Sequence, residues 1–234
     1  MIAGATGPAI APAATDSMVA RLKPLVFLAA LVPFGALVYG AFADTLGANP
    51  LDAITDETGT WTLRFLVLTL LITPLRRWTG WNWLIRYRRM LGLFAFFYGS
   101  LHFLTYIWFD QFFDLAEITA DIGRRPFITV GFSAFVLMVP LAATSTAGWI
   151  RRLGGRRWNR LHRLVYASAT LAVVHYLWLV KADTSRPVRY GVIIGILLAA
   201  RLWFAYNARH ANTSRAAAAR RGGLPDRVES ADAG

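Results

Sequence analysis

Six long apolar runs, separated by short charged connections, dominate this sequence. Each approaches the roughly 20 residues that a membrane-spanning helix requires, although the second is short and ends at Pro74. The runs are Pro24–Ala43, Trp61–Leu75, Met90–Phe109, Phe127–Thr144, Leu161–Val180 and Val188–Tyr206. Hydrophobic residues make up 56% of the 234 residues, too many for one compact soluble domain. The sequence therefore predicts an all-α membrane protein, a bundle of about six transmembrane helices.

Basic residues gather in the connections at one end of this predicted bundle. Lys and Arg in short loops resist translocation, so these loops are expected to be cytoplasmic. They carry Arg76, Arg77, Arg86, Arg88, Arg89, Arg151, Arg152, Arg156, Arg157, Arg160, Arg163, Arg209, Arg215, Arg220 and Arg221. The opposite side carries Asp44, Asp52, Asp56, Glu57, Asp110, Asp114, Glu117, Asp121 and Asp183. Both termini are therefore predicted to be cytoplasmic.

The two ends of the chain differ in composition from its apolar middle. Residues 1–22 are rich in Ala, Pro and Gly and lack a basic-then-apolar signal pattern, which predicts a flexible cytoplasmic N-terminus. Residues 23–207 are expected to form the six-helix transmembrane domain. Residues 208–234, rich in Ala, Arg and Gly, are expected to form a disordered cytoplasmic tail. The acidic connection from Asp110 to Arg125 is long enough for a short surface helix.

The charge and the absence of cysteine narrow the classes of function. The net charge of +12 comes from basic residues between apolar runs, so membrane topology explains it better than nucleic-acid binding. Without cysteine the chain has no disulfide, iron–sulfur cluster or Cys-ligated zinc site. The four histidines are therefore the main candidates for metal ligation. They are His102, His162, His175 and His210.

His102 and His175 lie inside apolar runs, where a polar group is costly and is usually partnered and functional. His102 lies 13 residues beyond Arg89, and His175 lies 13 residues beyond His162. At about 1.5 Å of rise per residue, both rings would lie roughly 20 Å from the cytoplasmic edge. Because the third and fifth helices both run outward, the two imidazoles are expected to be level and to ligate one heme iron axially.

Several alternatives to heme ligation stay open at this point. The two histidines could be unrelated core residues bonded to Ser, Thr or backbone groups, or part of a proton path. Zinc would need more ligands, and none is evident. Small residues near the histidines would leave room for a macrocycle, but they would also allow close helix packing. These small residues are Gly99, Ser100, Ala167, Ala169 and Ala172.

His162 lies among arginines at the cytoplasmic end of the fifth run, where it could ligate an inner heme or line the site of electron entry. The level position on the third run is Arg89 rather than a histidine, and an ideal helix turns His162 and His175 about 140° apart. The residues alone therefore leave a second heme open. The nearby arginines could also attract anionic lipid, a heme propionate or the phosphate of flavin mononucleotide (FMN). His210 is interpreted as a solvated tail residue.

Six ordered segments of the chain carry a specific family resemblance. They are NPLDAITDETGTWTLRFL from Asn49, LTLLITPLRRWTG from Leu68, IRYRRMLGLFAFFYGSLHFLTY from Ile85, RRPFITVGF from Arg124, LAATSTAGWIRRLGGRRWNRLHRLVY from Leu141 and HYLWLVKAD from His175. In these segments the chain resembles the MsrQ (YedZ) family, within the ferric-reductase-like transmembrane group. That family is the heme-binding membrane subunit of the periplasmic methionine-sulfoxide reductase system.

The resemblance implies a multi-pass b-type cytochrome of the bacterial inner membrane. Such a protein takes electrons from the quinone pool, with FMN association, and passes them to MsrP, a periplasmic molybdenum enzyme that reduces methionine sulfoxide in oxidised proteins. By motif, the family's heme histidines fall on His102 in GSLHFLTY, His162 in RLHRLVY and His175 in VVHYLWLVK. The implied cofactor is heme b, one group or two, and the flavin contacts cannot be placed on named residues.

The residues and the resemblance together predict an electron carrier with no catalytic site of its own for a soluble substrate. The chain lacks a GxGxxG fingerprint after a strand, so a nicotinamide cofactor is not expected to bind. Two rival classes remain. A proton-coupled transporter that used the buried histidines would be colourless when purified. A direct transmembrane ferric reductase would reduce ferric chelates without a partner subunit.

Overall fold

The computed structural model describes residues 12–222, and the regular structure of this part is helical throughout. Its elements are α1 (Pro12–Phe42), α2 (Pro50–Thr79), η1 (Asn82–Leu84), α3 (Ile85–Thr105), η2 (Tyr106–Asp110), α4 (Leu115–Arg124), α5 (Pro126–Ala143), α6 (Ala147–Leu161), α7 (Leu164–Leu179) and α8 (Ser185–Gly222). Five described helices are long and apolar enough to cross a membrane, and α7 is a shorter apolar helix. These findings confirm the predicted all-α, multi-pass membrane fold.

The ends of the described part bear on the predicted division of the chain. Residues 1–11 of the predicted flexible N-terminus and residues 223–234 of the predicted tail lie outside the described residues. Helix α1 already begins at Pro12, and α8 continues without a break to Gly222. The boundaries after residues 22 and 207 therefore coincide with no helix end, and the division stays a prediction.

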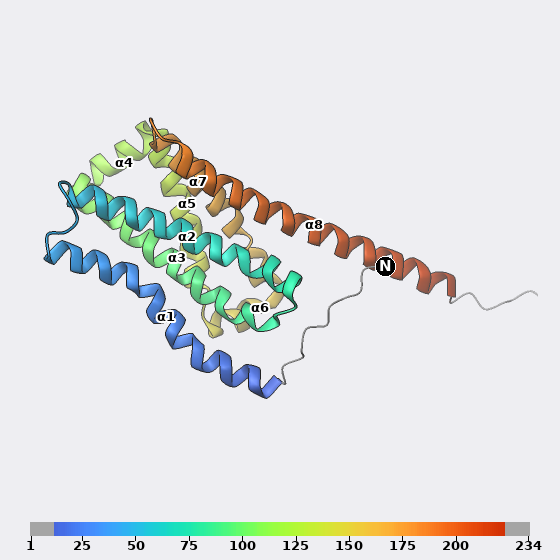
Figure 1. Ribbon diagram of the computed structural model, residues 1–234. Coiled ribbons are helices and arrows are strands. Elements are labelled where there is room, and N and C mark those ends of the chain that lie inside the picture. Colours follow the sequence, from blue (N-terminus) through green and yellow to red (C-terminus); the bar gives the residue numbers. More distant parts are fainter. Residues whose placement is uncertain (1–11, 223–234) are drawn as a thin grey trace, which may run out of the picture.

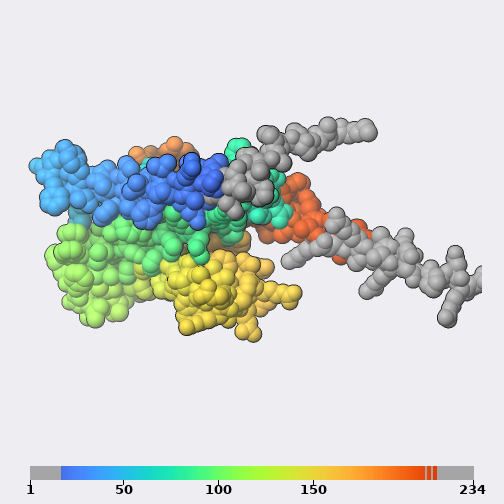
Figure 2. Space-filling model, turned by 90° about the horizontal axis from the view of Figure 1, so that it is seen from below, coloured from blue at the N-terminus to red at the C-terminus, as the bar shows by residue number. Residues whose placement is uncertain are grey.

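The helices form two antiparallel pairs, α2 with α3 and α5 with α7, that pack side by side (Figure 1). Helix α8 lies along α2 and α7, and α1 lies along the opposite side of the α2–α3 pair. In Figure 2 the blue residues of α1 and the yellow residues of α6 lie on opposite sides of the green residues between them. We call the end that carries α4 the acidic end and the end that carries α6 the basic end.

Helix α2 is longer than the sequence predicts, because it begins at Pro50 rather than at Trp61 and continues past Pro74. At its start the Asn49 side chain caps the helix by accepting a hydrogen bond from the Asp52 N–H, and proline is favourable in the first turn. At its end Gly80 adopts a left-handed conformation with φ 75°. The extra turns bring Thr55 and its neighbours to the level of the histidines.

Pro74 does not end α2, because an arginine from α8 compensates for the hydrogen bond that proline removes. Proline lacks the N–H that would bond to the Leu70 carbonyl in a regular helix. The Arg201 Nη2 donates to that carbonyl oxygen at 2.6 Å, and its Nη1 donates to the Tyr166 hydroxyl at 2.9 Å. Since the bilayer core offers no water to a free carbonyl, this intramembrane arginine fastens α8 to α2 and α7.

Tyr98 fastens α1 to α3 in a related way. Pro33 interrupts the hydrogen bonding of α1, and the helix bends in its middle (Figure 1). The buried Tyr98 hydroxyl accepts a hydrogen bond from the Phe34 N–H at 3.1 Å and donates to the Ala30 carbonyl at 2.8 Å. The hydroxyl thus lies between two groups that would bond directly in a regular helix.

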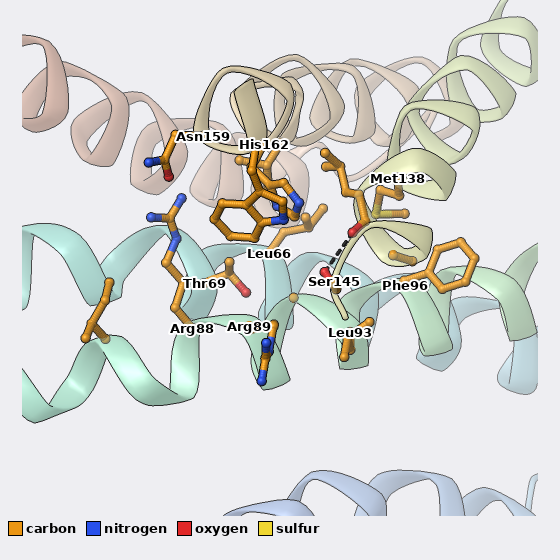
Figure 3. Close-up of a pocket in the computed structure, with 16 residues that line it drawn as sticks. Leu66, Thr69, Arg88, Arg89, Leu93, Phe96, Met138, Ser145, Asn159 and His162 are labelled. Atoms are coloured by element: carbon orange, nitrogen blue, oxygen red, sulfur yellow. Dashed lines mark hydrogen bonds between the residues drawn. The ribbon is translucent and has the colours of Figure 1, made fainter. Parts of the chain in front are cut away.

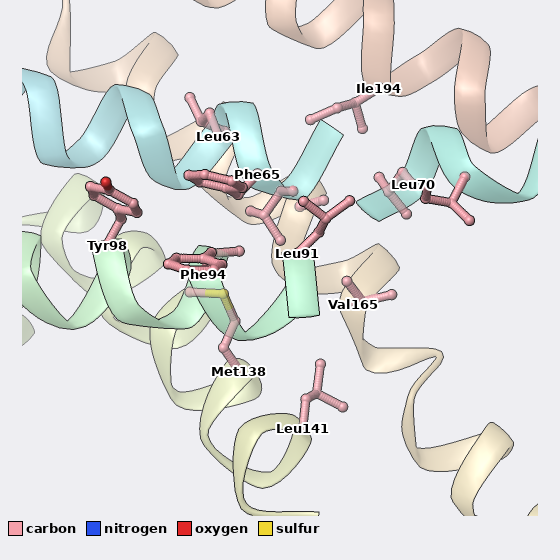
Figure 4. Close-up of a cluster of buried hydrophobic side chains, with 14 of the residues drawn as sticks. Leu63, Phe65, Leu70, Leu91, Phe94, Tyr98, Met138, Leu141, Val165 and Ile194 are labelled. Carbon is pink, nitrogen blue, oxygen red and sulfur yellow. The ribbon is translucent and has the colours of Figure 1, made fainter. Parts of the chain in front are cut away.

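Aromatic and aliphatic side chains from α2, α3, α5, α7 and α8 form the buried core between the helix pairs (Figure 4). The Phe65 ring stacks on Phe94 and on Tyr98, with ring centres 5.4 Å apart in each pair. Gly99 packs against Met138 and Thr62, because a Cβ there would lie 2.9 Å and 3.5 Å from their side-chain atoms. The small size of Gly99 therefore serves close packing of α3 against α5 and α2.

Candidate functional site

The rings of His102 on α3 and His175 on α7 face each other across the two helix pairs. Their centres are 6.2 Å apart, and their planes are inclined at 75°. The sequence-based expectation that these two imidazoles meet at one level is confirmed. Two imidazoles that coordinate one metal ion through bonds of about 2 Å place their ring centres roughly 6 Å apart. The observed distance between the ring centres is compatible with two axial ligands of one metal ion.

A backbone carbonyl of the neighbouring helix holds each of these rings. The Nδ1–H of His102 donates to the Thr55 carbonyl of α2 at 3.0 Å. The Nδ1–H of His175 donates to the Phe127 carbonyl of α5 at 2.7 Å. Since a carbonyl oxygen can only accept, both bonds require the proton on Nδ1. In both residues Nε2 is then the nitrogen with the free lone pair.

This arrangement is the one that metal-ligating histidines commonly show, with one ring nitrogen bonded to a carbonyl and the other directed at the metal. Among residues 12–222 neither Nε2 has a hydrogen-bond partner. In the same part of the chain no three His, Asp or Glu side chains converge as a metal cluster. The pair therefore suits a metal whose remaining ligands come from a macrocycle, as in heme.

His162 lies apart from this pair, at the junction of α6 and α7 near the basic end. The Thr144 hydroxyl donates to the Pro140 carbonyl at 2.6 Å, so its oxygen accepts from the Nε2–H of His162 at 3.2 Å. The Trp158 ring stacks on the imidazole with centres 3.8 Å apart. The proton of His162 is therefore on Nε2, opposite to the other two histidines.

Burial and the positive charge of Arg88 lower the pKa of His162 from 6.5 to about 4. The imidazole is therefore neutral at pH 7. A neutral imidazole keeps one lone pair, here on Nδ1, that can accept a hydrogen bond or bind a metal.

His162 lines a cavity of about 210 Å³ near the basic end (Figure 3). In Figure 3 the side chains of Arg88 and Asn159 point toward each other across it, from α3 and α6. The lining comprises Leu66, Thr69, Ile85, Arg88, Arg89, Gly92, Leu93, Phe96, Met138, Leu141, Ala142, Ser145, Trp158, Asn159, His162 and Val165. No lining residue is acidic, so the cavity combines an apolar wall with unneutralised positive charge and suits an amphiphilic or anionic ligand.

The buried carboxylate of Asp121 anchors α4 to the end of α3, where its partner Tyr106 lies one helical turn after His102. Asp121 accepts hydrogen bonds from the Tyr106 hydroxyl at 3.0 Å and from Gln111 Nε2 at 3.2 Å, and its other oxygen lies 2.8 Å from Arg125 Nε. Tyr106 begins a short π-helical segment, a feature frequent at functional sites. The predicted surface helix is thus present as α4, which is fixed at the acidic end of α3.

Comparisons with known proteins place the chain in a family. The model of the family "Ferric reductase like transmembrane component" matches residues 58–173. The chain is 56% identical over 197 residues to the protein-methionine-sulfoxide reductase heme-binding subunit MsrQ of Herminiimonas arsenicoxydans, covering 83% of this chain and 90% of that protein. The chain belongs to the MsrQ family.

Two further MsrQ proteins match at similar levels. The one from Azospira oryzae is 54% identical over 185 residues, covering 79% of each chain. The one from Rhodospirillum rubrum is 54% identical over 180 residues, covering 76% of this chain and 85% of the relative. These MsrQ relatives are named heme-binding subunits, and the family resemblance inferred from sequence segments is confirmed.

The structure brings together two of the three histidines carried over from the MsrQ motifs and separates the third. His102 and His175 form the pair, and His162 lines the cavity. His210 is exposed on α8, with its ring 4.1 Å from that of Tyr206. The sequence analysis missed the carbonyls of Thr55 and Phe127, because any residue type supplies a carbonyl. It also missed the Thr144 and Trp158 contacts of His162, which depend on how α5, α6 and α7 meet.

Proposed function

We propose that this chain is a b-type cytochrome subunit of the bacterial inner membrane that transfers electrons from the quinone pool to MsrP, the periplasmic molybdenum-containing methionine sulfoxide reductase. The observation that carries the proposal is the facing pair of histidines with Nδ1 of each ring bonded to a carbonyl. The MsrQ relatives at 52–56% identity support it. The chain would then support repair of oxidised periplasmic proteins as an electron-transfer subunit.

His102 and His175 would hold the heme through Nε2. Heme bound there supplies a one-electron redox centre within the membrane. The residues of the chain would fix the two ligand rings and set the polarity around them. The carbonyls of Thr55 and Phe127 keep both imidazoles in one tautomer, so that neither ring must reorganise when the iron changes charge.

We assign the entry of electrons to the cavity at the basic end, which would face the cytoplasm together with both termini. Its apolar wall suits a quinone ring and isoprenoid tail, and its arginines suit the phosphate of FMN. His162 would either accept a hydrogen bond from the entering redox group through Nδ1 or ligate an inner heme. The second role would use Nδ1, or require Nε2 to leave Thr144.

The acidic end would face the periplasm and dock MsrP. Exposed carboxylates surround the outer end of α3 there, among them Asp110, Asp114 and Glu117. Complementary charge across such a surface increases the rate of encounter more than the final affinity.

The alternatives make different demands on the histidine pair. A proton-coupled transporter would need histidines that exchange protons along a path, whereas both Nδ1–H groups are committed to carbonyls. A direct ferric reductase would use the same electron carrier but would reduce ferric chelates without MsrP. Ferric-chelate reduction by the purified chain alone separates this second alternative from the proposal.

The experiment is a reduced-minus-oxidised absorption spectrum of the detergent-purified wild type and of His102→Ala, His162→Ala, His175→Ala and His210→Ala. We expect a b-type signal in the wild type and in the exposed control His210→Ala. His102→Ala and His175→Ala should largely lose it, and His162→Ala should lose less. A colourless wild type, or full heme retention in both paired variants, would overturn the proposal.

A further inference from the structure

A glycine on the neighbouring helix packs against each ring of the His102–His175 pair. Gly59 on α2 lies against the His102 ring, and Gly131 on α5 lies against the His175 ring. We propose that Gly59 and Gly131 are ligand-positioning residues, which open a backbone carbonyl to each histidine and thereby fix Nε2 toward the iron. This inference rests on the proposed heme function and deepens it.

The two glycines occupy the same place relative to the carbonyls that hold the rings. Gly59 follows Thr55 by one helical turn, and Gly131 follows Phe127 by one helical turn. In an α-helix the Cβ of a residue points toward the N-terminus, so its side chain covers the carbonyl one turn earlier. Without a Cβ, that carbonyl keeps its helical bond and can also accept a second donor on its open side.

The space at each glycine is already taken by an imidazole. A Cβ on Gly131 would lie 2.6 Å from His175 Nδ1 and 2.8 Å from its Cε1. A Cβ on Gly59 would lie 3.1 Å from both His102 Nδ1 and Cε1. At Gly131 the nearest ring atom is the nitrogen bonded to the carbonyl, and at Gly59 that nitrogen is as near as Cε1. An alanine would therefore act on the hydrogen bond that sets the tautomer and on the height of the ring.

The two histidines show the same arrangement in two separate helix pairs, which argues against coincidence. His102 bonds a carbonyl 47 residues earlier, and His175 bonds a carbonyl 48 residues earlier. The contacts are not equal, however. The hydrogen bond of His175 is 2.7 Å long and that of His102 is 3.0 Å. A Cβ on Gly131 would also lie closer to the His175 ring than a Cβ on Gly59 would to the His102 ring. Gly131 should therefore be less tolerant of substitution than Gly59.

The test measures heme affinity by titrating heme into the heme-free, detergent-purified full chain. Mutation of a group that hydrogen-bonds to a metal-ligating histidine commonly lowers the affinity for the metal by about 10- to 100-fold. We expect a loss in that range for Gly131→Ala, a smaller loss for Gly59→Ala, and a shifted midpoint potential in the heme that remains. The matched controls are Gly35→Ala on α1 and Gly195→Ala on α8, where a Cβ meets nothing within 4 Å. Wild-type affinity and potential in both site variants would overturn the proposal.

A double-mutant cycle separates ring positioning from ordinary helix packing. Thermal unfolding of the heme-free protein is compared for wild type, Gly131→Ala, His175→Ala and the double variant. We expect Gly131→Ala to lower the melting temperature when His175 is present and to be neutral when the ring is removed. This holds even if Gly131→Ala alone fails to fold, because His175→Ala should then restore folding.

An equal cost of Gly131→Ala in both backgrounds would assign the glycine to packing and overturn the inference. The cycle needs no heme, so it also separates this inference from the proposed function. A wild type that binds no heme would refute the cytochrome, whereas the cycle would still decide whether the His175 ring depends on Gly131.

Discussion

The ring of His102 lies 6.2 Å from the ring of His175, although the two residues belong to different helix pairs. His102 is held by α2 within the α2–α3 pair, and His175 is held by α5 within the α5–α7 pair. Each pair can therefore orient its own ligand before the two pairs meet. An iron bound between the rings would tie the pairs together, and its binding energy would stabilise their packing.

The first prediction is that heme raises the thermal stability of the protein. A ligand that binds the folded state alone stabilises it by about 2.7 kcal/mol at a concentration of 100 Kd. The melting temperature of the heme-loaded protein in detergent should therefore exceed that of the heme-free protein. Adding heme should not raise the melting temperature of His102→Ala, whereas His210→Ala should respond as the wild type does. Equal melting temperatures with and without heme would contradict the prediction.

The second prediction concerns the arginine that compensates for Pro74. Arg201→Met removes both donors, leaving the Leu70 carbonyl unpaired within the membrane and removing the bond to Tyr166. A buried polar group without its partner costs about 1–3 kcal/mol. The variant should unfold at a lower temperature in detergent.

The control for Arg201→Met is Arg186→Met on the same helix. Arg186 is exposed and lies 3.6 Å from Asp56, and such surface ion pairs contribute about 0–1 kcal/mol. If the two variants were equally stable, Arg201 would not be the residue that fastens α8 to α2.

The sequence was sufficient to predict the helices that contain the histidines, because apolar length and basic connections are properties of the chain itself. The sequence also predicts that His102 and His175 lie at the same depth, because each is the same number of residues from the basic end and their helices run in the same direction. The start of α2 at Pro50 did not follow, because its first turns are polar and are kept helical by the Asn49 cap and by packing on α3. The sequence predicts a basic connection rather than the helix α6, because this segment is rich in arginines that lie exposed to solvent and it contains no long apolar run.

The contacts that build the site could not be predicted in the same way. The acceptor for each Nδ1–H is a main-chain oxygen, and it becomes accessible only through the absence of a side chain at Gly59 or Gly131. A glycine in an apolar helix indicates a close approach, but it does not indicate what approaches. The sequence interpretation gave Gly99 two roles, room for a macrocycle or close helix packing, and the structure supports packing against Met138 and Thr62.

The third prediction is that Asp121 keeps α4 in place beside the site. Asp121→Ala leaves the Tyr106 hydroxyl and Gln111 without their acceptor and removes the ion pair with Arg125. Local opening of α4 should become easier, and its backbone amides should exchange hydrogen about tenfold faster or more. Hydrogen exchange measured by mass spectrometry on the detergent-purified protein reports this. Glu117→Ala, an exposed change on the same helix, should leave exchange close to that of the wild type.

The fourth prediction concerns orientation, and the absence of cysteine makes it directly measurable. Short basic loops stay in the cytoplasm, so α6 should lie inside and α4 should lie on the periplasmic side. Thr119→Cys places a single thiol on exposed α4, and Arg157→Cys places one on exposed α6. A membrane-impermeant maleimide added to intact cells should label the first variant and should label the second only after the inner membrane is permeabilised. The reverse pattern would place the cavity and His162 on the periplasmic side and would exclude electron entry from the cytoplasmic face.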